Sequence, residues 1–298
     1  MSSCWGAGTG FYDVMPALIP HLGIAGTKLV DGFPQRIPSV AAQIMVTELA
    51  TGTLQALVDG TWITAWRTGA VAAHSALLFG NAHPLHGEFT DVQRVGMVSL
   101  GNTAAACLHV LAEARPERLF EVTVLEYKDQ HERFAERFGE FPNVRMRSVA
   151  DMRELVGEKD VVVSAASHFD GDQCEPGWFA PGTTVIPIFK VGFNNLNPVF
   201  DLVFVDDVEG IKGWAGGQNI ADPVEVASVV RGEHSGRTAA EQRIVCHNLG
   251  IALHDIYWAS RLLDLTCCDG SDSADGNNLY TMSSTEVDLG APASRVWV

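Results

Sequence analysis

A strand, a tight turn and a helix start follow one another at residues 94–111, and this stretch constrains the fold most. It opens with the apolar residues 95–98, turns through the small residues 99–104, and continues as an alanine-rich apolar segment. Such a turn lets a phosphate approach the backbone and meet free N–H groups at a helix N-terminus. Only Gly101 and Ala104 keep the spacing of the dinucleotide-binding pattern G-x-G-x-x-[GA], because serine occupies the first position. The rest of the chain must therefore decide whether a dinucleotide binds here.

Apolar runs and helical segments alternate from residue 94 to residue 207. Strands are expected at 121–126, 144–149, 160–166, 183–188 and 202–205, with helices at 129–138 and 151–156. This alternation predicts an α/β fold, a doubly wound parallel sheet with helices on both faces. Ligands of such sheets gather at the carboxyl ends of the strands, which are Ser99, Glu126, Ser164 and Ile188. Glu126 follows the glycine turn by about 20 residues, where a carboxylate holds an adenosine ribose.

The outer segments of the chain carry a different pattern. Residues 42–50 and 54–59 read as the two strands of a hairpin. Thr61 or Thr64 is expected to cap the helix that follows. Helical spacing over residues 238–265 predicts one long helix that breaks near its internal glycine, and ordinary helix positions for its histidines.

These patterns predict a discontinuous second domain into which the parallel sheet is inserted. The polar loop at residues 81–93 is taken as the passage between the two domains. The expected parts are an outer α+β domain of residues 1–88 and 225–266, a dinucleotide-binding domain of residues 89–224, and a disordered polar tail of residues 267–298. The family resemblance described below implies that the outer domain serves substrate binding and dimerisation.

Two cations lie in apolar surroundings of the first outer segment. Lys28 belongs to the short strand 26–30, where a buried ammonium group needs an anionic partner; an edge strand with Lys28 in water fits this stretch equally well. Arg67 lies among Ala and Trp residues, so its guanidinium should face an anion rather than bulk water. A guanidinium fork and an ammonium point charge beside a cofactor suit a small carboxylate substrate.

Composition excludes several classes of partner. The formal net charge of -16 opposes binding to nucleic acid or to an anionic membrane. No stretch approaches about 18 uninterrupted apolar residues, and the first residues lack the basic and apolar regions of a secretory signal. The six cysteines form no C-x-x-C pair, which favours free thiols in a reducing cytoplasm and no metal site. The pair Asp206 and Asp207 resembles a set of metal ligands, but a turn at a strand end is the interpretation we favour.

Several segments resemble the ornithine cyclodeaminase/mu-crystallin family, in the family's order. Gly26-Thr27-Lys28 followed by Pro38-Ser39 is similar to the strand with the family's active-site lysine. Residues 64–70 (TAWRTGA) are similar to its helix start T-A-x-R-T-x-A. Residues 236–238 (GRT) and 249–255 (LGIALHD) are similar to its C-terminal G-R-x and V-G-x-A-L-x-D elements. The resemblance extends roughly from Gly23 to Leu265.

The resemblance implies a Rossmann domain that carries NAD or NADP, and a dimerisation domain built from both chain ends, hence a homodimer. It implies hydride transfer at the α-carbon of a small amino or imino acid, with imine formation or reduction and, in cyclodeaminases, loss of ammonia. Lys28 and Arg67 would hold the substrate carboxylate, with Lys28 as an anchor rather than a general base. Glu126 favours NAD, although the neighbouring Lys128 leaves NADP open. The implied cofactor-binding residues are Ser39, Thr68, Ser99, Gly101, Asn102, Thr103, Ala104, Glu126, Ser164, Ala165, Ala166 and Asn248.

The chain departs from the family pattern in three places. Asn194 replaces the acid of the V-G-x-D segment that handles the substrate amine, and an amide can hydrogen-bond a substrate but cannot carry a proton as an acid or base. Asp206 or Asp207 are the candidates to substitute for it. Ser99 replaces the first glycine, and a serine makes this turn if its φ is negative. Family members usually carry about 40 further N-terminal residues, with a substrate-contacting arginine, that we expect to be missing here.

Taken together, the sequence predicts an NAD(P)-dependent enzyme of amino acid or imine metabolism, an ornithine cyclodeaminase-like lyase or oxidoreductase. The alternative is a mu-crystallin-like protein that holds a nucleotide or ligand without catalysis. The missing acid favours this alternative, and the retained Lys28 and Arg67 oppose it. A truncated and poorly folded product is the third possibility.

Overall fold

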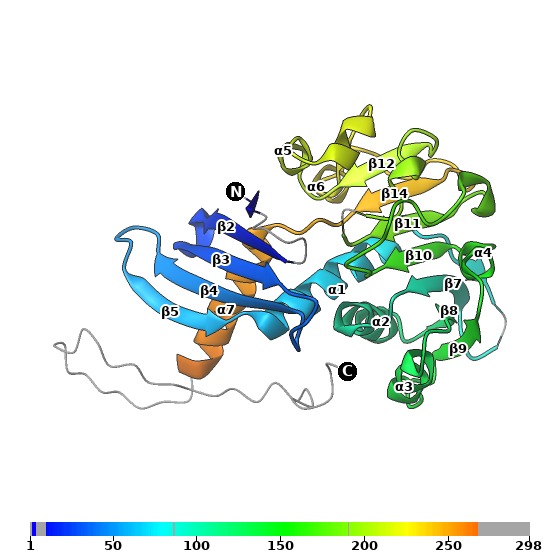
Figure 1. Ribbon diagram of the computed structural model, residues 1–298, viewed down its shortest axis with the longest axis horizontal. Coiled ribbons are helices and arrows are strands. Elements are labelled where there is room, and N and C mark those ends of the chain that lie inside the picture. The colour runs from blue at the N-terminus through cyan, green and yellow to red at the C-terminus, as the bar shows by residue number, and fades with distance from the viewer. Residues whose placement is uncertain (1, 4–9, 86, 190, 268–298) are drawn as a thin grey trace. The chain divides into compact units, whose positions relative to one another are not determined.

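The computed structural model describes residues 2–3, 10–85, 87–189 and 191–267 (Figure 1). Contacts divide the chain into two compact units: unit 1 is Met1–Thr64 with Ile251–Val298, and unit 2 is Ala65–Gly250. The predicted boundaries near residues 88 and 224 thus both fall inside unit 2. The predicted disordered tail lies outside the described residues, apart from its first residue, Cys267.

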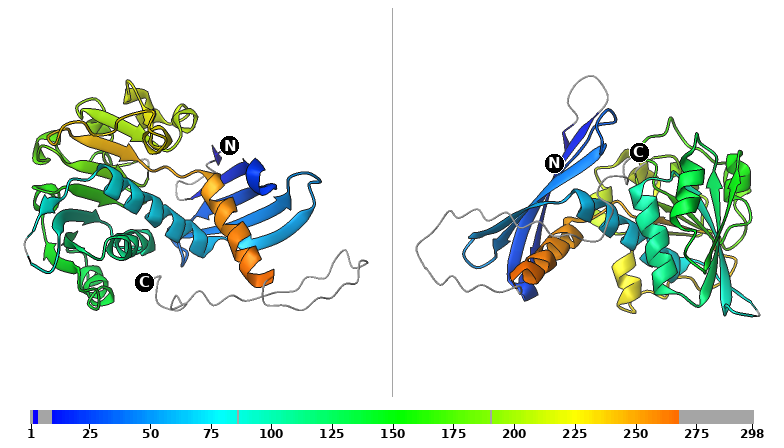
Figure 2. Two further views of the ribbon diagram at one scale, coloured as in Figure 1. Left: turned by 180° about the vertical axis from the view of Figure 1, so that it is seen from behind. Right: turned by 90° about the horizontal axis from the view of Figure 1, so that it is seen from below.

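Unit 1 is an antiparallel sheet with one helix on it. Its strand order follows the chain: β1 (Ser2–Ser3), β2 (Phe11–Ile19), β3 (Ile24–Gly32), β4 (Val40–Glu48) and β5 (Leu54–Asp59), with the 3₁₀ turn Pro20–Leu22 between β2 and β3. Helix α7 (Ala252–Cys267) covers one face, as Figure 2 shows. Ile24, Ile44 and Val46 of the sheet pack there against Ile256 and Ala259 of the helix. The period-two burial of these strands is the pattern of a sheet with one covered face.

The predicted hairpin in unit 1 is present as β4 and β5, which pair in antiparallel register. The prediction for the cap of helix α1 (Thr61–Phe79) is wrong. Asp59 Oδ1 accepts the Thr61 N–H at 2.9 Å, whereas the Thr64 hydroxyl donates to the Gly60 carbonyl. A carboxylate two residues before the first helical N–H groups satisfies them better than a hydroxyl inside the helix does.

Unit 2 contains a nine-stranded sheet whose main path is wholly parallel. The spatial order of the path is β13 (Val224–Glu225), β12 (Leu202–Val205), β14 (Ile244–His247), β11 (Thr184–Pro187), β10 (Val161–Ser164), β7 (Asp91–Val98), β8 (Arg118–Leu125) and β9 (Val144–Val149). The short β6 (His83–Pro84) pairs antiparallel with β7. Chain order reverses between β7 and β10, and such a switch point is where doubly wound sheets bind ligands.

Helices cover both faces of the parallel sheet, as expected for a doubly wound fold (Figure 1). One core joins the sheet to α1, α2 (Asn102–Ala114) and α3 (Gln130–Arg137), and it contains Phe79, Leu108 and Phe134. The other joins it to α4 (Met152–Val156) and α5 (Val208–Ile211). Helix α6 (Val226–Val230) and three further 3₁₀ segments complete the helical elements of the described residues. These segments are Pro176–Trp178, Asn194–Leu196 and Ala215–Asn219. The predicted fold class, a parallel α/β sheet beside a separate antiparallel sheet, is confirmed.

The long helix predicted for residues 238–265 is wrong. Residues 244–247 form β14, between β11 and β12, and α7 begins only at Ala252. All four residues of β14 are buried, so their apolar side chains fill both cores at once. A short run buried on both faces has no period that distinguishes a strand from a helix. Within the described residues, no helix is long and apolar enough to cross a membrane.

Candidate functional site

The turn between β7 and α2 leaves open space at the end of the central strand. Gly101 precedes the first turn of α2 with φ -75° and ψ -173°, and no side chain caps that turn. A Cβ at Gly101 would meet nothing within 4 Å. The unpaired N–H groups of the first helical turn therefore have room for an anionic ligand.

Ser99 departs from its expected conformation in this turn. Its φ is +68°, in the left-handed region, so the expectation of a negative φ is wrong. This conformation costs a residue with a Cβ about 1–2 kcal/mol, whereas glycine adopts it without that cost.

Buried amides and a close helix contact surround the same turn. Asn102 is 7% exposed, and its Nδ2 has no hydrogen-bond partner among the described residues. Gly69 of α1 lets the two helices touch, since a Cβ there would lie 2.6 Å from the Thr103 carbonyl. Thr68 and Arg67 are therefore carried on a helix that packs against the first turn of α2.

The neighbouring strand ends bring further predicted residues to this edge. Ser164, at the end of β10, is 2% exposed, and the Ala165 N–H donates to the Val98 carbonyl at 3.0 Å. Residues 164–166 thus lie beside the end of β7, at the switch point. Glu126 follows the end of β8 and accepts a 3.0 Å hydrogen bond from the Ser148 hydroxyl. An oriented, exposed carboxylate beyond the second strand is placed as ribose recognition requires.

Asn248 follows β14 at the same edge of the sheet. Its side chain is 1% exposed, and its Oδ1 has no hydrogen-bond partner among the described residues. A buried amide oxygen of this kind carries a desolvation cost unless a ligand or water bonds it.

Arg67, Asp206 and Gly250 form a compact group within unit 2. Arg67 is 6% exposed, and its guanidinium packs on Gly250 so closely that a Cβ there would lie 2.6 Å from Nη1. Gly250 has φ +91°, and its N–H donates to Asp206 Oδ2. Sequence reasoning named Arg67 but did not connect it to Asp206, because the two are 139 positions apart in the chain.

The two adjacent aspartates have different environments. Burial raises the pKa of Asp206 to about 6, although the Gly250 N–H and the Arg67 charge oppose that rise. Asp207 instead accepts the Glu209 N–H at 3.1 Å and caps α5. The pair is a turn at a strand end, as favoured from the sequence, but only Asp206 faces the arginine.

Lys28 belongs to unit 1, on the face of the sheet that α7 covers. It lies on β3, which is hydrogen-bonded on both sides, and is 1% exposed. Its Nζ donates to Asp255 Oδ1 at 2.8 Å. The alternative of an edge strand with Lys28 in water is therefore excluded. Sequence reasoning missed Asp255, although it is the last residue of the family-like segment LGIALHD. Ser39 also lies in unit 1, exposed in the loop between β3 and β4.

Asn194, which follows β11, is contacted by the loops after β10 and β12. Its backbone N–H donates to Asp172 Oδ1 at 2.8 Å, and its Nδ2 would lie 2.8 Å from a Cβ at Gly216. The nearby Asn197 bonds His247 at 2.8 Å, and burial lowers the pKa of His247 to about 3. The imidazole is therefore neutral over the physiological range, and it lies in the sheet core rather than on a helix.

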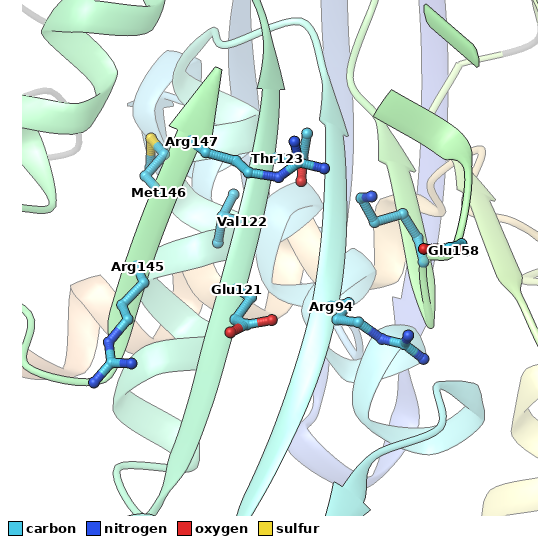
Figure 3. A pocket seen from close by; sticks show the side chains of 9 residues that line it. Arg94, Glu121, Val122, Thr123, Arg145, Met146, Arg147 and Glu158 are labelled. Atoms are coloured by element: carbon cyan, nitrogen blue, oxygen red, sulfur yellow. The ribbon is translucent and has the colours of Figure 1, made fainter. Parts of the chain in front are cut away.

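A cavity of about 270 Å³ lies over the middle of β7, β8 and β9 (Figure 3). Two of its cations are paired with carboxylates: Arg94 bonds Asp160 at 2.8 Å, and Arg147 bonds Glu154 at 2.9 Å. Lys159 donates to the Gly157 carbonyl at 2.8 Å. Ligands of parallel sheets bind beyond the carboxyl ends of the strands, and none of the strand-end residues lines this cavity. This cavity is therefore not the candidate site.

The residues at the carboxyl edge fit a dinucleotide. Open space at Gly101, free N–H groups at the start of α2, and the orphaned amide atoms of Asn102 and Asn248 suit phosphate and carboxamide groups. No group of three or more His, Cys, Asp or Glu side chains that could hold a metal ion occurs in the described ranges.

Known proteins with the same fold include nicotinamide-dependent enzymes. The Thermococcus litoralis Δ1-pyrroline-2-carboxylate reductase, solved with NADH and L-proline, superimposes with a TM-score of 0.72 at 21% identity, over 87% of this chain and 84% of that one. An archaeal alanine dehydrogenase dimer with bound NAD gives a TM-score of 0.70 at 19% identity, over 90% and 85%. At these identities the likeness concerns the fold.

Sequence comparison identifies the family. The nodulation efficiency protein NfeD of Rhizobium meliloti is 23% identical over 262 residues, which are 84% of this chain and 78% of that protein. The model of the ornithine cyclodeaminase/mu-crystallin family matches residues 2–198. The resemblance inferred from the lysine strand and the arginine helix is thereby confirmed, and the chain belongs to the ornithine cyclodeaminase/mu-crystallin family.

Proposed function

We propose that this protein is an NAD(H)-dependent oxidoreductase that interconverts a small imino acid and the corresponding amino acid. One observation carries the proposal: a buried arginine on α1 and an open, uncapped helix start at Gly101 belong to the same edge of one parallel sheet. The first suits a carboxylate, and the second suits a pyrophosphate. The nicotinamide-dependent enzymes that share this fold support the same reading.

The cofactor would be held by groups of unit 2. The turn residues Ser99, Gly101, Asn102, Thr103 and Ala104 would bind the pyrophosphate, with Thr68 beside them. Ser164, Ala165, Ala166 and Asn248 would border the nicotinamide half. Glu126, oriented by Ser148, would bind the ribose hydroxyls and favour NAD, because a carboxylate repels a 2′-phosphate. The bound nicotinamide supplies or accepts the hydride.

Arg67 of unit 2 would hold the substrate carboxylate, and the family resemblance implies an anchoring role for Lys28 as well. A guanidinium offers two parallel N–H bonds to a carboxylate and so fixes the orientation of the α-carbon. Lys28 is paired with Asp255, whose carboxylate stabilises the charged ammonium form. A general base must be neutral, so this pairing favours the role of anchor.

Asn194 argues for a reaction without loss of ammonia. An amide can hydrogen-bond a substrate nitrogen, but it cannot give or take the proton that ring closure and deamination require. Reduction of a cyclic imine does not require a proton-transferring group at residue 194, whereas cyclodeamination does. The absence of an acid at this position also supports the second candidate, a mu-crystallin-like binding protein without turnover.

The open face of the sheet in unit 1 supports assembly as a homodimer. In register across four strands it presents Pro16, Thr27, Met45 and Leu57, with Val14 and Leu18 alongside. Leu18 is 62% and Leu57 67% exposed, and a hollow of about 500 Å³ lies among these residues. An apolar sheet face of this kind is commonly covered by a second copy. We place the dimer in the cytoplasm, where its buried Cys107, Cys174 and Cys246 would remain thiols.

The decisive experiment combines cofactor binding with a substrate screen. NADH and NADPH are titrated by fluorescence, and Δ1-pyrroline-2-carboxylate and pyruvate with ammonium are then tested with NADH by absorbance at 340 nm. L-Proline, L-alanine and L-ornithine are tested with NAD in the reverse direction. Tighter binding of NADH than of NADPH and turnover of at least one pair are expected.

Variants identify the site that carries the activity. Arg67→Ala should lower kcat/KM about 100-fold or more while NADH still binds, because a bidentate charge-assisted pair is lost. Arg145→Ala, at an exposed arginine of β9, is the matched control and should leave turnover unchanged. Cofactor binding without any turnover would favour the binding protein, and absence of cofactor binding would refute both readings.

A further inference from the structure

We propose that Asp206 is a positioning residue for Arg67, and that it acts by holding the Gly250 peptide against which the guanidinium packs. This inference rests on the proposed function in one respect, since Arg67 is taken to bind the substrate carboxylate. In this proposal the carboxyl group of Asp206 sets the position and the effective charge of Arg67. Neither the carboxyl group of Asp207 nor the amide of Asn194 has this role.

The first step is the connection between Asp206 and the segment after β14. The Gly250 N–H donates to Asp206 Oδ2, and the Asp206 N–H donates to the His247 carbonyl at 3.3 Å. Side chain and backbone of one residue thus hold both ends of the short segment 247–250. Asp206 directly follows β12, whose neighbour in the sheet is β14, so the connection has a rigid base.

The second step is the contact between this segment and Arg67. Gly250 takes φ +91°, a conformation that favours glycine, and a Cβ there would lie 2.6 and 3.0 Å from the two terminal nitrogens of Arg67. The guanidinium plane therefore rests on the Gly250 backbone. A shift of that peptide moves the guanidinium, because the two groups are already in contact and the arginine is 6% exposed.

The other candidates for this role are engaged elsewhere. Asp207 accepts the Glu209 N–H as the cap of α5, and its Oδ2 lies 3.0 Å from the position of a Cβ on Gly210. Asn194 lies with Asp172 and Gly216. The Arg67 charge acts on Asp206, where it opposes the rise of the pKa that burial causes.

Because Asp206 adjoins Arg67, the affinity of this site for a carboxylate should change with pH around the pKa of Asp206. Burial raises the pKa of Asp206 to about 6. Of the other groups that face it, the buried His247 has a pKa of about 3, and burial raises the pKa of the Cys246 thiol to about 12. The charges of Arg67 and Asp207 act on Asp206 in opposite directions, the first lowering its pKa and the second raising it. Below pH 6 the neutral Asp206 leaves the Arg67 charge undiminished, so carboxylate binding should tighten.

A ligand-independent test uses NMR on protein labelled with ¹⁵N-glycine and ¹⁵N-arginine. The Gly250 amide and the Arg67 Nε signals, assigned with Gly250→Ala and Arg67→Lys, should titrate together with a midpoint near pH 6. Asp206→Asn retains an acceptor for the Gly250 N–H but cannot ionise, so both titrations should disappear. Asp207→Asn should leave them in place. An Arg67 signal that stays constant while Gly250 titrates would overturn the proposal.

A kinetic test uses Δ1-pyrroline-2-carboxylate with NADH. Asp206→Ala should raise KM about five- to tenfold at pH 8, with kcat within about twofold, because one hydrogen bond that holds Gly250 is lost. Asp206→Asn should restore a low KM and remove its rise between pH 5 and pH 8. An unchanged KM in Asp206→Ala, or a pH dependence that persists in Asp206→Asn, contradicts the proposal. If the wild type turns over no substrate, the proposed function fails and the NMR result alone decides the role of Asp206.

Discussion

Ser99 occupies a backbone conformation that its side chain disfavours. Because φ is +68°, Ser99→Gly should raise the free energy of unfolding by about 0.5–1 kcal/mol, the relief of strain less the greater freedom of glycine in the unfolded chain. Urea denaturation with and without NADH measures this gain. Ser99→Ala is the matched control: it removes the hydroxyl but keeps the Cβ, and should gain nothing. Equal stabilisation by both variants would show that the hydroxyl, not the conformation, is the source of strain.

The ionisation of Asp206 should make stability depend on pH. The carboxyl has its ordinary pKa of 3.8 in the unfolded chain and about 6 in the folded one, so between these values the folded state binds more protons. Stability is therefore lost as pH rises from about 4 to about 6, and the loss persists above it. A shift of this size corresponds to about 3 kcal/mol, which partial solvent access reduces to about 1–2 kcal/mol.

Asp206→Asn tests this linkage by thermal or urea denaturation at several pH values. The variant should be more stable than the wild type at pH 8 and equal to it at pH 4. Asp207→Asn alters the cap of α5, and its stability difference from the wild type should not follow this pH dependence. A constant difference between Asp206→Asn and the wild type across this range would mean that the carboxyl does not change its pKa on folding.

Single residues show where sequence reasoning was sufficient and where it was not. Apolar neighbours predicted a buried Arg67 that faces an anion, because an unpaired charge there would be costly. For Lys28 they left a buried, paired ammonium group and an exposed edge-strand position equally open. The partners, Asp255 and Asp206, come from distant segments and could not be named. The sign of φ at Ser99 could not be predicted from the sequence either, since serine can adopt a negative or a positive φ at modest cost.

At the scale of elements, the Lys28–Asp255 pair fastens α7 to β3 inside unit 1. Both side chains are essentially unexposed, so removing one partner leaves a charge in the core. Asp255→Asn should lower the free energy of unfolding by about 3 kcal/mol or more, measured by urea denaturation. The double variant Lys28→Met/Asp255→Leu should recover most of that loss, because it removes both charges and keeps an apolar core. A single variant as stable as the wild type would show that Lys28 folds in its neutral form.

The elements that were predicted well are those whose period is visible. Strands β7 to β12 are bounded by turn residues, and the hairpin of β4 and β5 has a clear Thr-Gly-Thr turn. The sequence pattern predicts a helix where β14 lies, because its three apolar residues and His247 stand between two segments with helical spacing. Its strand pairing is set by β11 and β12, which are distant in sequence, so tertiary contacts decide what the local pattern leaves open.

At the scale of the whole molecule, the open face of the unit 1 sheet predicts the oligomeric state. Leu18→Lys combined with Met45→Lys places two charges on that face and should convert a dimer into monomers in sedimentation velocity runs. Leu253→Lys, at an exposed leucine of α7, is the matched control and should remain dimeric. A wild-type monomer at micromolar concentration would refute the proposed assembly.

The alternation of strands and helices was enough to predict the architecture of unit 2, because a parallel sheet requires a crossover between successive strands. The limits of the units were not visible in the same way. Composition changes at the polar loop 81–93, but the compact units divide within α1 and after Gly250. A helix that continues without a break from one unit into the other gives no signal of a boundary in its sequence.

Unit 2 enters at Ala65 and leaves at Gly250, and the Arg67–Gly250 contact brings these two ends together. A segment whose ends adjoin can be exchanged between homologous genes as a single cassette, because the host chain needs to bridge only a short gap. The splice points would fall on either side of Arg67, the residue proposed to hold the substrate carboxylate. A graft of this kind would therefore transfer the arginine together with nucleotide recognition, while the lysine stays with the recipient.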